Sequence, residues 1–392
     1  MPRILRIINR FNLGGPTYNA AYLTRHLPPR YETMLLGGMK DESEDSSQFI
    51  VENLGITPVV LDVMQREINL TRDYEAFKQI KKIIAEFKPD IVHTHASKPG
   101  ALGRWAAHQM GVPVIVHTFH GHVFHSYFNS AKTSLYRNLE RKLASISTKI
   151  IAISDKQKQE LSEDHLICEP EKIEVIPLGF DLDRFQSNID KKREVFREEF
   201  SLKYGDIAVS IVGRLVPIKN HNLFFDSIKW VKPKLNKRIK GFVVGDGESR
   251  AYLEEYCSKI GLTHSNDSND DVDIYFTSWV KNVDYVNSGS DIIALTSKNE
   301  GTPVSLIEAQ AGNRAIVSTR VGGIEDVVLP EKTALLSDLN NPEEFYQNLL
   351  KLCKDKTMRD SFGDRGWTFV KDKFHYERLV DDVTKLYDKL LI

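Results

Sequence analysis

The sequence has few cysteines and no cysteine motif. Its three cysteines, Cys168, Cys257 and Cys353, lie far apart and share no C-x-x-C spacing. An odd, sparse set of this kind argues against a disulfide framework and against a zinc site built on paired cysteines. We therefore expect reduced thiols of an intracellular protein that pack as small apolar side chains.

Long hydrophobic runs and an excess of one charge are also missing. No apolar run approaches the roughly 18–20 residues of a membrane span, and charges interrupt the apolar residues at the N-terminus, so no signal-peptide core forms. Lysine plus arginine (53) nearly equals aspartate plus glutamate (54), which argues against a dedicated nucleic-acid-binding protein. We expect a cytoplasmic protein that at most attaches to the inner face of a membrane.

The chain does contain a regular alternation of short apolar runs and longer amphipathic stretches. This alternation predicts βαβ units, and hence an α/β protein with doubly wound parallel sheets. A helix with apolar residues at three- and four-residue steps is expected at 74–87. Strands are expected at 3–8, 33–36, 57–61, 90–93, 114–119, 149–153 and 173–176, then at 207–212, 241–244, 273–276, 291–295, 315–318 and 334–336, with a polar loop at 264–273.

The length and the restart of the pattern predict two Rossmann-like domains. A chain of 392 residues exceeds one ordinary domain of roughly 100–200 residues. We expect an N-terminal domain at 1–185, a C-terminal domain at 186–372, and a final helix at 373–392 that packs back on the first domain. Because open α/β sheets bind ligands at the carboxyl ends of their strands, functional residues should follow strands and face a cleft between the domains.

The most informative segment runs from Asn299 to Ala309, after a predicted strand. Pro303 suits the first turn of a helix, where its missing N–H would be unpaired anyway. A helix start favours an anion such as phosphate through its dipole and its free N–H groups, here those of Gly301, Thr302 and Val304. Glu300, before the helix, and Glu308, about two turns into it, could accept hydrogen bonds from hydroxyls of a sugar and a ribose. The alternative is that Glu300 helps to cap the helix and that Glu308 is an exposed acid without a binding role.

Two further loops follow predicted strands of the second domain. Gly213 opens a loop in which Arg214 and Lys219, five positions apart, can converge on one diphosphate, although basic residues are common at strand ends. A Gly-Asp-Gly-Glu loop at 245–248 permits a sharp turn that could border a nucleobase. The simpler interpretation of that loop is that Asp246 caps the next helix.

In the first domain, Gly14 and Gly15 follow the first strand and open a helix, where backbone amides could meet a phosphate. They lack the G-x-G-x-x-G spacing, and a tight turn is an equally good interpretation. Histidines cluster after two other strands, at His93, His95, His117, His120, His122 and His125. Because no metal-site signature or nearby acid or thiol accompanies them, we expect no metal, whereas His120 could hydrogen-bond a sugar.

For two further patterns we prefer a structural interpretation to a functional one. Asp181 and Asp183 form a D-x-D pattern, but they lie in the predicted hinge and indicate a turn. The basic helices at 76–88 and 127–142 are typical of solvated faces. The alternative is that these helices dock to an anionic membrane.

Together, and in this order, these segments resemble the retaining glycosyltransferases of the GT-B fold, in particular the bacterial group called family 4. The resemblance covers essentially the whole chain. It rests on the glycine pair at 14–15, His120, the cations at 214 and 219, the loop at 245–248 and the two acids at 300 and 308. The stretches 93–100 and 120–125 are similar to transferases of capsule, exopolysaccharide or lipid-linked oligosaccharide assembly. The chain departs from the family at 313–314 and at 334, away from the phosphates.

The resemblance implies a role for each matching residue. Arg214 and Lys219 would bind the diphosphate of a nucleotide-sugar donor, which we expect to be UDP-linked, and stabilise it as it leaves. Glu300 would hold hydroxyls of the donor sugar, Glu308 the ribose, and His120 would contact the sugar at the reacting centre. Further donor-binding positions would be Gly14, Gly15, Gly213, Gly245, Gly301, Thr302, Pro303 and Val304. The acceptor would be a glycan or a polyprenyl-linked glycan, with no metal or other cofactor.

Three alternatives stay open at this point. The first is another chemistry of the same fold, such as a sugar-nucleotide epimerase or a phosphorylase that carries pyridoxal phosphate. The second is a non-catalytic nucleotide-sugar-binding protein, a class that is usually exported. The third is a nicotinamide-dependent oxidoreductase, which the missing glycine fingerprint disfavours.

Overall fold

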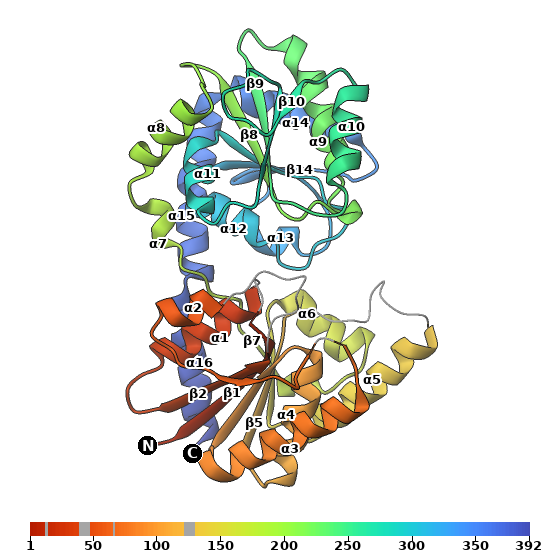
Figure 1. Cartoon of the computed structure of the whole chain (residues 1–392), viewed down its shortest axis with the longest axis vertical. Helices are drawn as coiled ribbons and strands as arrows, with labels where there is room; N and C mark the ends of the chain where they lie inside the picture. Colours follow the sequence, from red (N-terminus) through yellow and green to blue (C-terminus); the bar gives the residue numbers. More distant parts are fainter. Residues whose placement is uncertain (12–14, 39–47, 66, 121–129) are drawn as a thin grey trace. The chain divides into compact units, whose positions relative to one another are not determined.

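The computed structural model describes residues 1–392 except 12–14, 39–47, 66 and 121–129 (Figure 1). The chain forms two compact units, one of Met1–Phe180 with Lys373–Ile392 and the other of Asp181–Asp372. The sequence placed the boundary at 185/186, whereas the structure places it between Phe180 and Asp181, ahead of the short helix α7 (Asp183–Gln186).

The first unit contains a seven-stranded parallel sheet with the order β3-β2-β1-β4-β5-β6-β7. Its strands are β1 (Arg3–Arg10), β2 (Glu32–Gly38), β3 (Val59–Leu61), β4 (Ile91–His95), β5 (Val114–Phe119), β6 (Lys149–Ala152) and β7 (Ile173–Val175). All seven predicted strands are present. The order reverses between β1 and β4, as in a doubly wound sheet.

Helices cover both faces of this first sheet (Figure 1). Neighbouring residues of a strand point to opposite faces, so Ile4 of β1 packs against α1 (Gly15–His26) and α16 (Tyr376–Leu390), while Leu5 packs against α3 (Leu70–Phe87) and α4 (Ser97–Gln109). Helix α3 starts four residues before the predicted position because the Asn69 side chain accepts a hydrogen bond from the Arg72 backbone N–H. The unit also contains α2 (Gln48–Asn53), α5 (Ser130–Ser145) and α6 (Asp155–Gln159).

The second unit repeats the plan with a sheet in the order β10-β11-β9-β8-β12-β13-β14. Its strands are β8 (Ile207–Val212), β9 (Ile239–Val244), β10 (His264–Ser265), β11 (Ile274–Ser278), β12 (Ile292–Leu295), β13 (Ala315–Thr319) and β14 (Ala334–Ser337). The prediction of an unbroken polar loop at 264–273 is wrong. Its first two residues form β10, since they pair with Ile274 and Tyr275 at the edge of the sheet.

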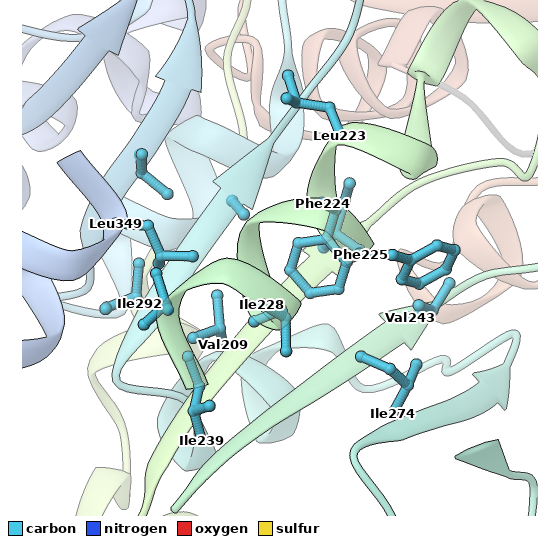
Figure 2. Packing of buried hydrophobic residues seen from close by; sticks show 14 of the residues in the cluster. Val209, Leu223, Phe224, Phe225, Ile228, Ile239, Val243, Ile274, Ile292 and Leu349 are labelled. Atoms are coloured by element: carbon cyan, nitrogen blue, oxygen red, sulfur yellow. The ribbon is translucent and has the colours of Figure 1, made fainter. Parts of the chain in front are cut away.

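The core of the second unit lies between its sheet and helices α9 (His221–Val231), α10 (Arg250–Lys259) and α14 (Pro342–Lys354). Figure 2 shows Phe224 and Ile228 of α9 pointing to the sheet residues Val209 and Val243. The opposite face packs against α8 (Ile189–Glu199) and α11 (Val283–Gly289), with Phe196 at the contact. The remaining helices are α12 (Val304–Ala311), α13 (Ile324–Val327) and α15 (Lys356–Phe374).

Across the described residues, every helix is too short or too polar to cross a membrane.

Candidate functional site

In the second unit, the strand order reverses between β8 and β12, and the loops after these two strands are tied together. The Thr296 hydroxyl donates a hydrogen bond to the Lys219 carbonyl at 2.8 Å. The backbone N–H of Lys298 donates to the Ile218 carbonyl, also at 2.8 Å. Open α/β sheets bind ligands at such a reversal. The candidate phosphate loop and the Glu300 segment therefore lie at one edge of one sheet.

Lys219 and Glu300 are in direct contact at this edge. Their side chains form an ion pair, and the same carboxylate oxygen, Oε1, accepts a hydrogen bond from the Ser297 hydroxyl. Only 23% of the Lys219 side chain and 11% of the Glu300 side chain are exposed. The Lys219 ammonium thus holds an anionic oxygen of Glu300, while Arg214 lies exposed in the same loop.

The Gly-Asp-Gly-Glu loop packs against the loop that carries Arg214 and Lys219. Gly245 has a φ of +139°, and a Cβ atom there would lie 2.0 Å from the Gly213 carbonyl oxygen, so only glycine fits. The prediction that Asp246 caps the next helix is wrong, because α10 begins at Arg250. Asp246 instead accepts a hydrogen bond from the Gly247 N–H and pairs with Arg250 at 2.8 Å, which lowers its pKa.

Helix α12 presents its N-terminus at the same edge. The helix begins at Val304 with Pro303 as its N-cap, so Glu308 lies in the second turn, nearer the helix start than the sequence suggested. The first N–H groups of a helix have no partner within it. A Cβ atom at Gly301 would meet no atom within 4 Å, so there is open space before this helix, and Thr302 is partly exposed.

Sequence reasoning missed the loop after β13, which supports Glu300. The Gly323 N–H donates to the Glu300 carbonyl at 3.0 Å, and a Cβ atom at Gly322 would lie 1.9 Å from the same oxygen. The Thr319 hydroxyl donates to the Ser297 carbonyl at 2.7 Å. The signal was present in the sequence, since this is a second Gly-Gly pair after a strand.

Glu308 is largely buried, with 18% of its side chain exposed, rather than the exposed acid of the alternative interpretation. Burial raises its pKa to about 7, while the nearby cation of Arg184 acts in the opposite direction. The two charged groups lie 3.8 Å apart, and Arg184, from α7, is a second residue that sequence reasoning missed. Glu308 therefore changes its charge near neutral pH.

His120 follows β5 in the first unit and joins a chain of histidines. Its Nε2 lies 2.9 Å from Nδ1 of His95, and the two rings are stacked with centroids 5.1 Å apart. Burial lowers the pKa of His120 to about 4, so the ring is neutral at pH 7. His120 and the residues of the Lys219 site belong to different units, and each is described within its own unit.

Some predicted residues lie outside the part of the chain that is described. These are Gly14, His122 and His125, whereas Gly15 is the first residue of α1. Within the described ranges, no group of three or more histidine, cysteine, aspartate or glutamate side chains is arranged to hold a metal ion.

Known families match both halves of the chain. Residues 13–184 match Glycosyltransferase Family 4, and residues 192–368 match Glycosyl transferases group 1. The chain is 30% identical over 328 residues to the UDP-Gal:alpha-D-GlcNAc-diphosphoundecaprenol alpha-1,3-galactosyltransferase of Escherichia coli, covering 83% of this chain and 82% of that one. It is 25% identical over 333 residues to the capsular polysaccharide biosynthesis glycosyltransferase CapM of Staphylococcus aureus, covering 84% of each.

The fold also matches a solved structure. The Anabaena protein Alr3699/HepE, crystallised in complex with UDP, superposes with a TM-score of 0.79 at 16% identity, covering 99% of this chain and all of that one. At this level of identity the match establishes the architecture, two Rossmann-like domains of the GT-B type.

Proposed function

The chain belongs to the family 4 glycosyltransferases of the GT-B fold, and on that premise we propose the reaction that it catalyses. It transfers a sugar from a nucleoside diphosphate to a glycan or lipid-linked acceptor and retains the configuration of the transferred carbon. One observation carries the proposal. Lys219, Glu300 and the N-terminus of α12 gather where the strand order of the second unit reverses.

In the proposed site, Lys219 and Arg214 bind the diphosphate. The Lys219 ammonium already holds a carboxylate oxygen, and a diphosphate offers more negative charge and more oxygens. Gly213 and Gly245, packed backbone to backbone, leave no side chain between the loop and the phosphates. The family resemblance extends the proposal to Gly14 and Gly15 of the first unit as further contacts of the phosphates.

The N-terminal end of α12 supplies the remaining donor contacts. The positive end of the helix dipole and the N–H groups at its start face the diphosphate. These groups belong to Gly301, Thr302 and Val304, with Pro303 contributing no competing N–H. Glu300 accepts hydrogen bonds from hydroxyls of the donor sugar, Glu308 accepts them from the ribose, and His120 contacts the sugar near the carbon that is transferred.

In the transfer itself, the bond between the sugar carbon and the diphosphate oxygen breaks. The acceptor hydroxyl oxygen bonds to that carbon on the same face, and its proton passes to the departing phosphate oxygen. Negative charge grows on the diphosphate as it leaves. Arg214, Lys219 and the helix N-terminus stabilise that charge, a type of stabilisation that contributes much of the rate enhancement of many enzymes. In this scheme no metal ion or other cofactor takes part.

The relatives support a UDP-linked donor and a surface-polysaccharide acceptor. The Escherichia coli relative is named for a UDP-linked galactose and a diphosphoundecaprenol acceptor, and the Staphylococcus aureus relative for capsule biosynthesis. We propose a UDP-sugar donor and a polyprenyl-linked or glycan acceptor for this chain as well.

A lipid-linked acceptor would bring the enzyme to the inner face of a membrane, and α5 offers a surface for that contact. Leu135 and Leu139 lie four residues apart, on one side of the helix, and are 69% and 43% exposed. Lys142 lies exposed one turn further along. On α3, Lys82 is 78% exposed. Exposed leucines beside lysines suit an anionic lipid surface, and we propose a cytoplasmic enzyme with this peripheral contact.

A panel of nucleotide sugars tests the proposed reaction. Thermal stabilisation identifies the donor, and product analysis with a polyprenyl-diphosphate-linked sugar identifies the acceptor and the anomeric configuration. We expect transfer with retention that persists in EDTA. Loss in EDTA that one divalent ion restores would contradict the metal-free scheme, and conversion of the donor sugar without any acceptor would indicate an epimerase.

The residue assignment needs a test of its own. Lys219→Ala should lower transfer by at least about 100-fold with unfolding unchanged, since it removes a charge that stabilises the leaving group. Lys259→Ala is a matched control, because this lysine is exposed on α10. Near-normal transfer by Lys219→Ala would defeat the assignment.

A further inference from the structure

A chain of buried polar groups runs beneath α16 in the first unit. Arg6 of β1 is fully buried, and its Nη2 donates to the Tyr387 hydroxyl of α16 at 3.1 Å. The Tyr387 hydroxyl lies 2.6 Å from Nδ1 of His93, and Nε2 of His93 lies 2.7 Å from the Thr118 hydroxyl. Tyr387 and His93 are separated by 294 residues in the sequence, so the last helix completes this chain.

The direction of these hydrogen bonds follows from the chemistry of the groups. A guanidinium can only donate, so the Tyr387 oxygen accepts from Arg6 and its own proton goes to Nδ1 of His93. Burial lowers the pKa of His93, so the ring is neutral and carries its proton on Nε2. That proton is donated to Thr118. Arg6 thus fixes the tautomer of His93 from one end of the chain.

His95 stacks on the ring of His93 and contacts His120. The His93 and His95 rings are stacked with centroids 4.3 Å apart, and His95 is 1% exposed. Nδ1 of His95 lies 2.9 Å from Nε2 of His120. The other nitrogen of each ring, Nε2 of His95 and Nδ1 of His120, is buried without a hydrogen-bond partner among the described residues.

Only one proton can occupy the hydrogen bond between two neutral rings. Burial lowers the pKa of both His95 and His120, so each ring carries one proton. If that shared proton is on His120, both rings have their proton on Nε2; if it is on His95, both have it on Nδ1. In either state, one of the two remaining nitrogens, Nε2 of His95 and Nδ1 of His120, is a donor and the other is an acceptor. This is the pair of groups that a hydroxyl satisfies, since a hydroxyl both donates and accepts.

We propose that His95 and Tyr387 are positioning residues for the transfer reaction, which fix the orientation and proton arrangement of His120 from beneath. His95 acts directly through the bond to His120, and Tyr387 acts through His93. A cavity of about 10 Å³, with room for about one water molecule, is lined by His95, Thr118 and His120 and by Leu379 and Val383 of α16. The inference rests on the role proposed above for His120.

The proton arrangement can be measured without any activity. In protein labelled with ¹⁵N-histidine, long-range ¹⁵N–¹H correlation spectra report which nitrogen of each ring carries the proton. We expect His95 and His120 to share one tautomer, both Nε2–H or both Nδ1–H, and His93 to be Nε2–H. Tyr387→Phe should change the His93 signals because Nδ1 loses its donor. Opposite tautomers for His95 and His120 would overturn the proposal.

Two substitutions at His95 separate positioning from packing. The amide of asparagine can occupy the place of Nδ1 and keep the contact with His120, whereas the amide of glutamine reaches the place of Nε2. We expect His95→Asn to stay within about threefold of wild-type kcat. We expect His95→Gln to lose about 10- to 100-fold, with the donor KM and the melting temperature unchanged, the scale seen when supporting residues of a site are removed. Equal activity of the two variants would overturn the proposal.

His120→Ala separates the role proposed for His120 from the positioning role proposed for His95 and Tyr387. If His120→Ala is inactive and His95→Gln is fully active, the positioning role fails and the proposed role of His120 stands. If His120→Ala itself transfers sugar normally, the role proposed for His120 fails, whatever the spectra show. Should His95→Gln be unstable, Tyr387→Phe provides the same test, because it removes one hydroxyl and keeps the ring packed. Its kcat should fall at unchanged donor KM, and an unchanged kcat would overturn the proposal.

Discussion

Replacing Glu300 with glutamine removes the negative charge that holds the Lys219 ammonium. The proposed donor site requires this ammonium to bind a diphosphate, so Glu300 and the diphosphate compete for it. A carboxylate beside a bound diphosphate also repels it. We therefore expect Glu300→Gln to bind free UDP more tightly than the wild type, although it transfers sugar more slowly because a hydroxyl of the donor sugar loses its charged acceptor.

The size of the effect follows from the burial of the pair. Two unit charges 4 Å apart interact by about 4 kcal/mol at the effective dielectric constant of a protein surface, which is an upper limit. Exposed pairs contribute about 0–1 kcal/mol. The side chains of Lys219 and Glu300 are 23% and 11% exposed, so we expect an interaction energy between these two values. We take about 1.4 kcal/mol, which corresponds to a tenfold change in affinity. We expect the Kd for UDP to fall about tenfold and kcat to fall by at least about tenfold.

Isothermal titration of UDP into wild type and Glu300→Gln measures the first quantity, and steady-state transfer measures the second. Glu255→Gln, at an exposed position of α10, makes the same charge change and should leave both values unaltered. The difference between wild type and Glu300→Gln should shrink as salt screens the pair. Unchanged or weaker binding of UDP by Glu300→Gln would refute the idea that the two anions share Lys219.

Three further outcomes are expected. Burial raises the Glu308 pKa from 4.5 to about 7, so between these pH values the folded protein keeps a proton that the unfolded chain loses. The free energy of unfolding, measured with urea, should therefore fall as the pH rises from 4.5 to about 7. The fall should be smaller in Glu308→Gln. Gly245→Ala should raise the donor KM at least about tenfold, because its Cβ would lie 2.0 Å from a backbone carbonyl of the β8 loop, while Gly261→Ala, with a φ of +83° and open space, should lower only the melting temperature. Co-sedimentation with anionic vesicles should weaken in Lys81→Glu/Lys82→Glu, and equal binding would remove α3 from the proposed membrane contact.

The sequence was sufficient for the fold because the fold depends on local patterns. Short apolar runs between amphipathic helices identified thirteen of the fourteen strands. The missing strand, β10, consists of a histidine and a serine before a polar run, and it pairs only because β11 leaves an edge open. Nothing in the composition of two polar residues could reveal that.

The contacts of the candidate site were harder to predict because they join distant parts of the chain. Lys219 meets Glu300 across 81 residues, and His93 meets Tyr387 across 294. The position of each residue after a strand predicted the shared sheet edge, but not which side chains would pair. Asp246 was hard to predict for a different, local reason: Arg250, four residues further along, pairs with the carboxylate that we expected to cap the next helix.

The path of the chain through its two units has a consequence for how the protein is made. The backbone N–H of Phe180 donates to the Phe374 carbonyl, and that of Tyr376 donates to the Phe180 carbonyl. These hydrogen bonds join the segment where the chain leaves the first unit to the segment where it returns. Everything between them, Asp181–Asp372, is in effect an insertion into the first unit. During synthesis the inserted unit can fold as soon as it emerges, whereas the first must wait with an uncovered apolar face until residues 373–392 arrive. A fragment of the inserted unit should therefore be the easier piece to produce by itself.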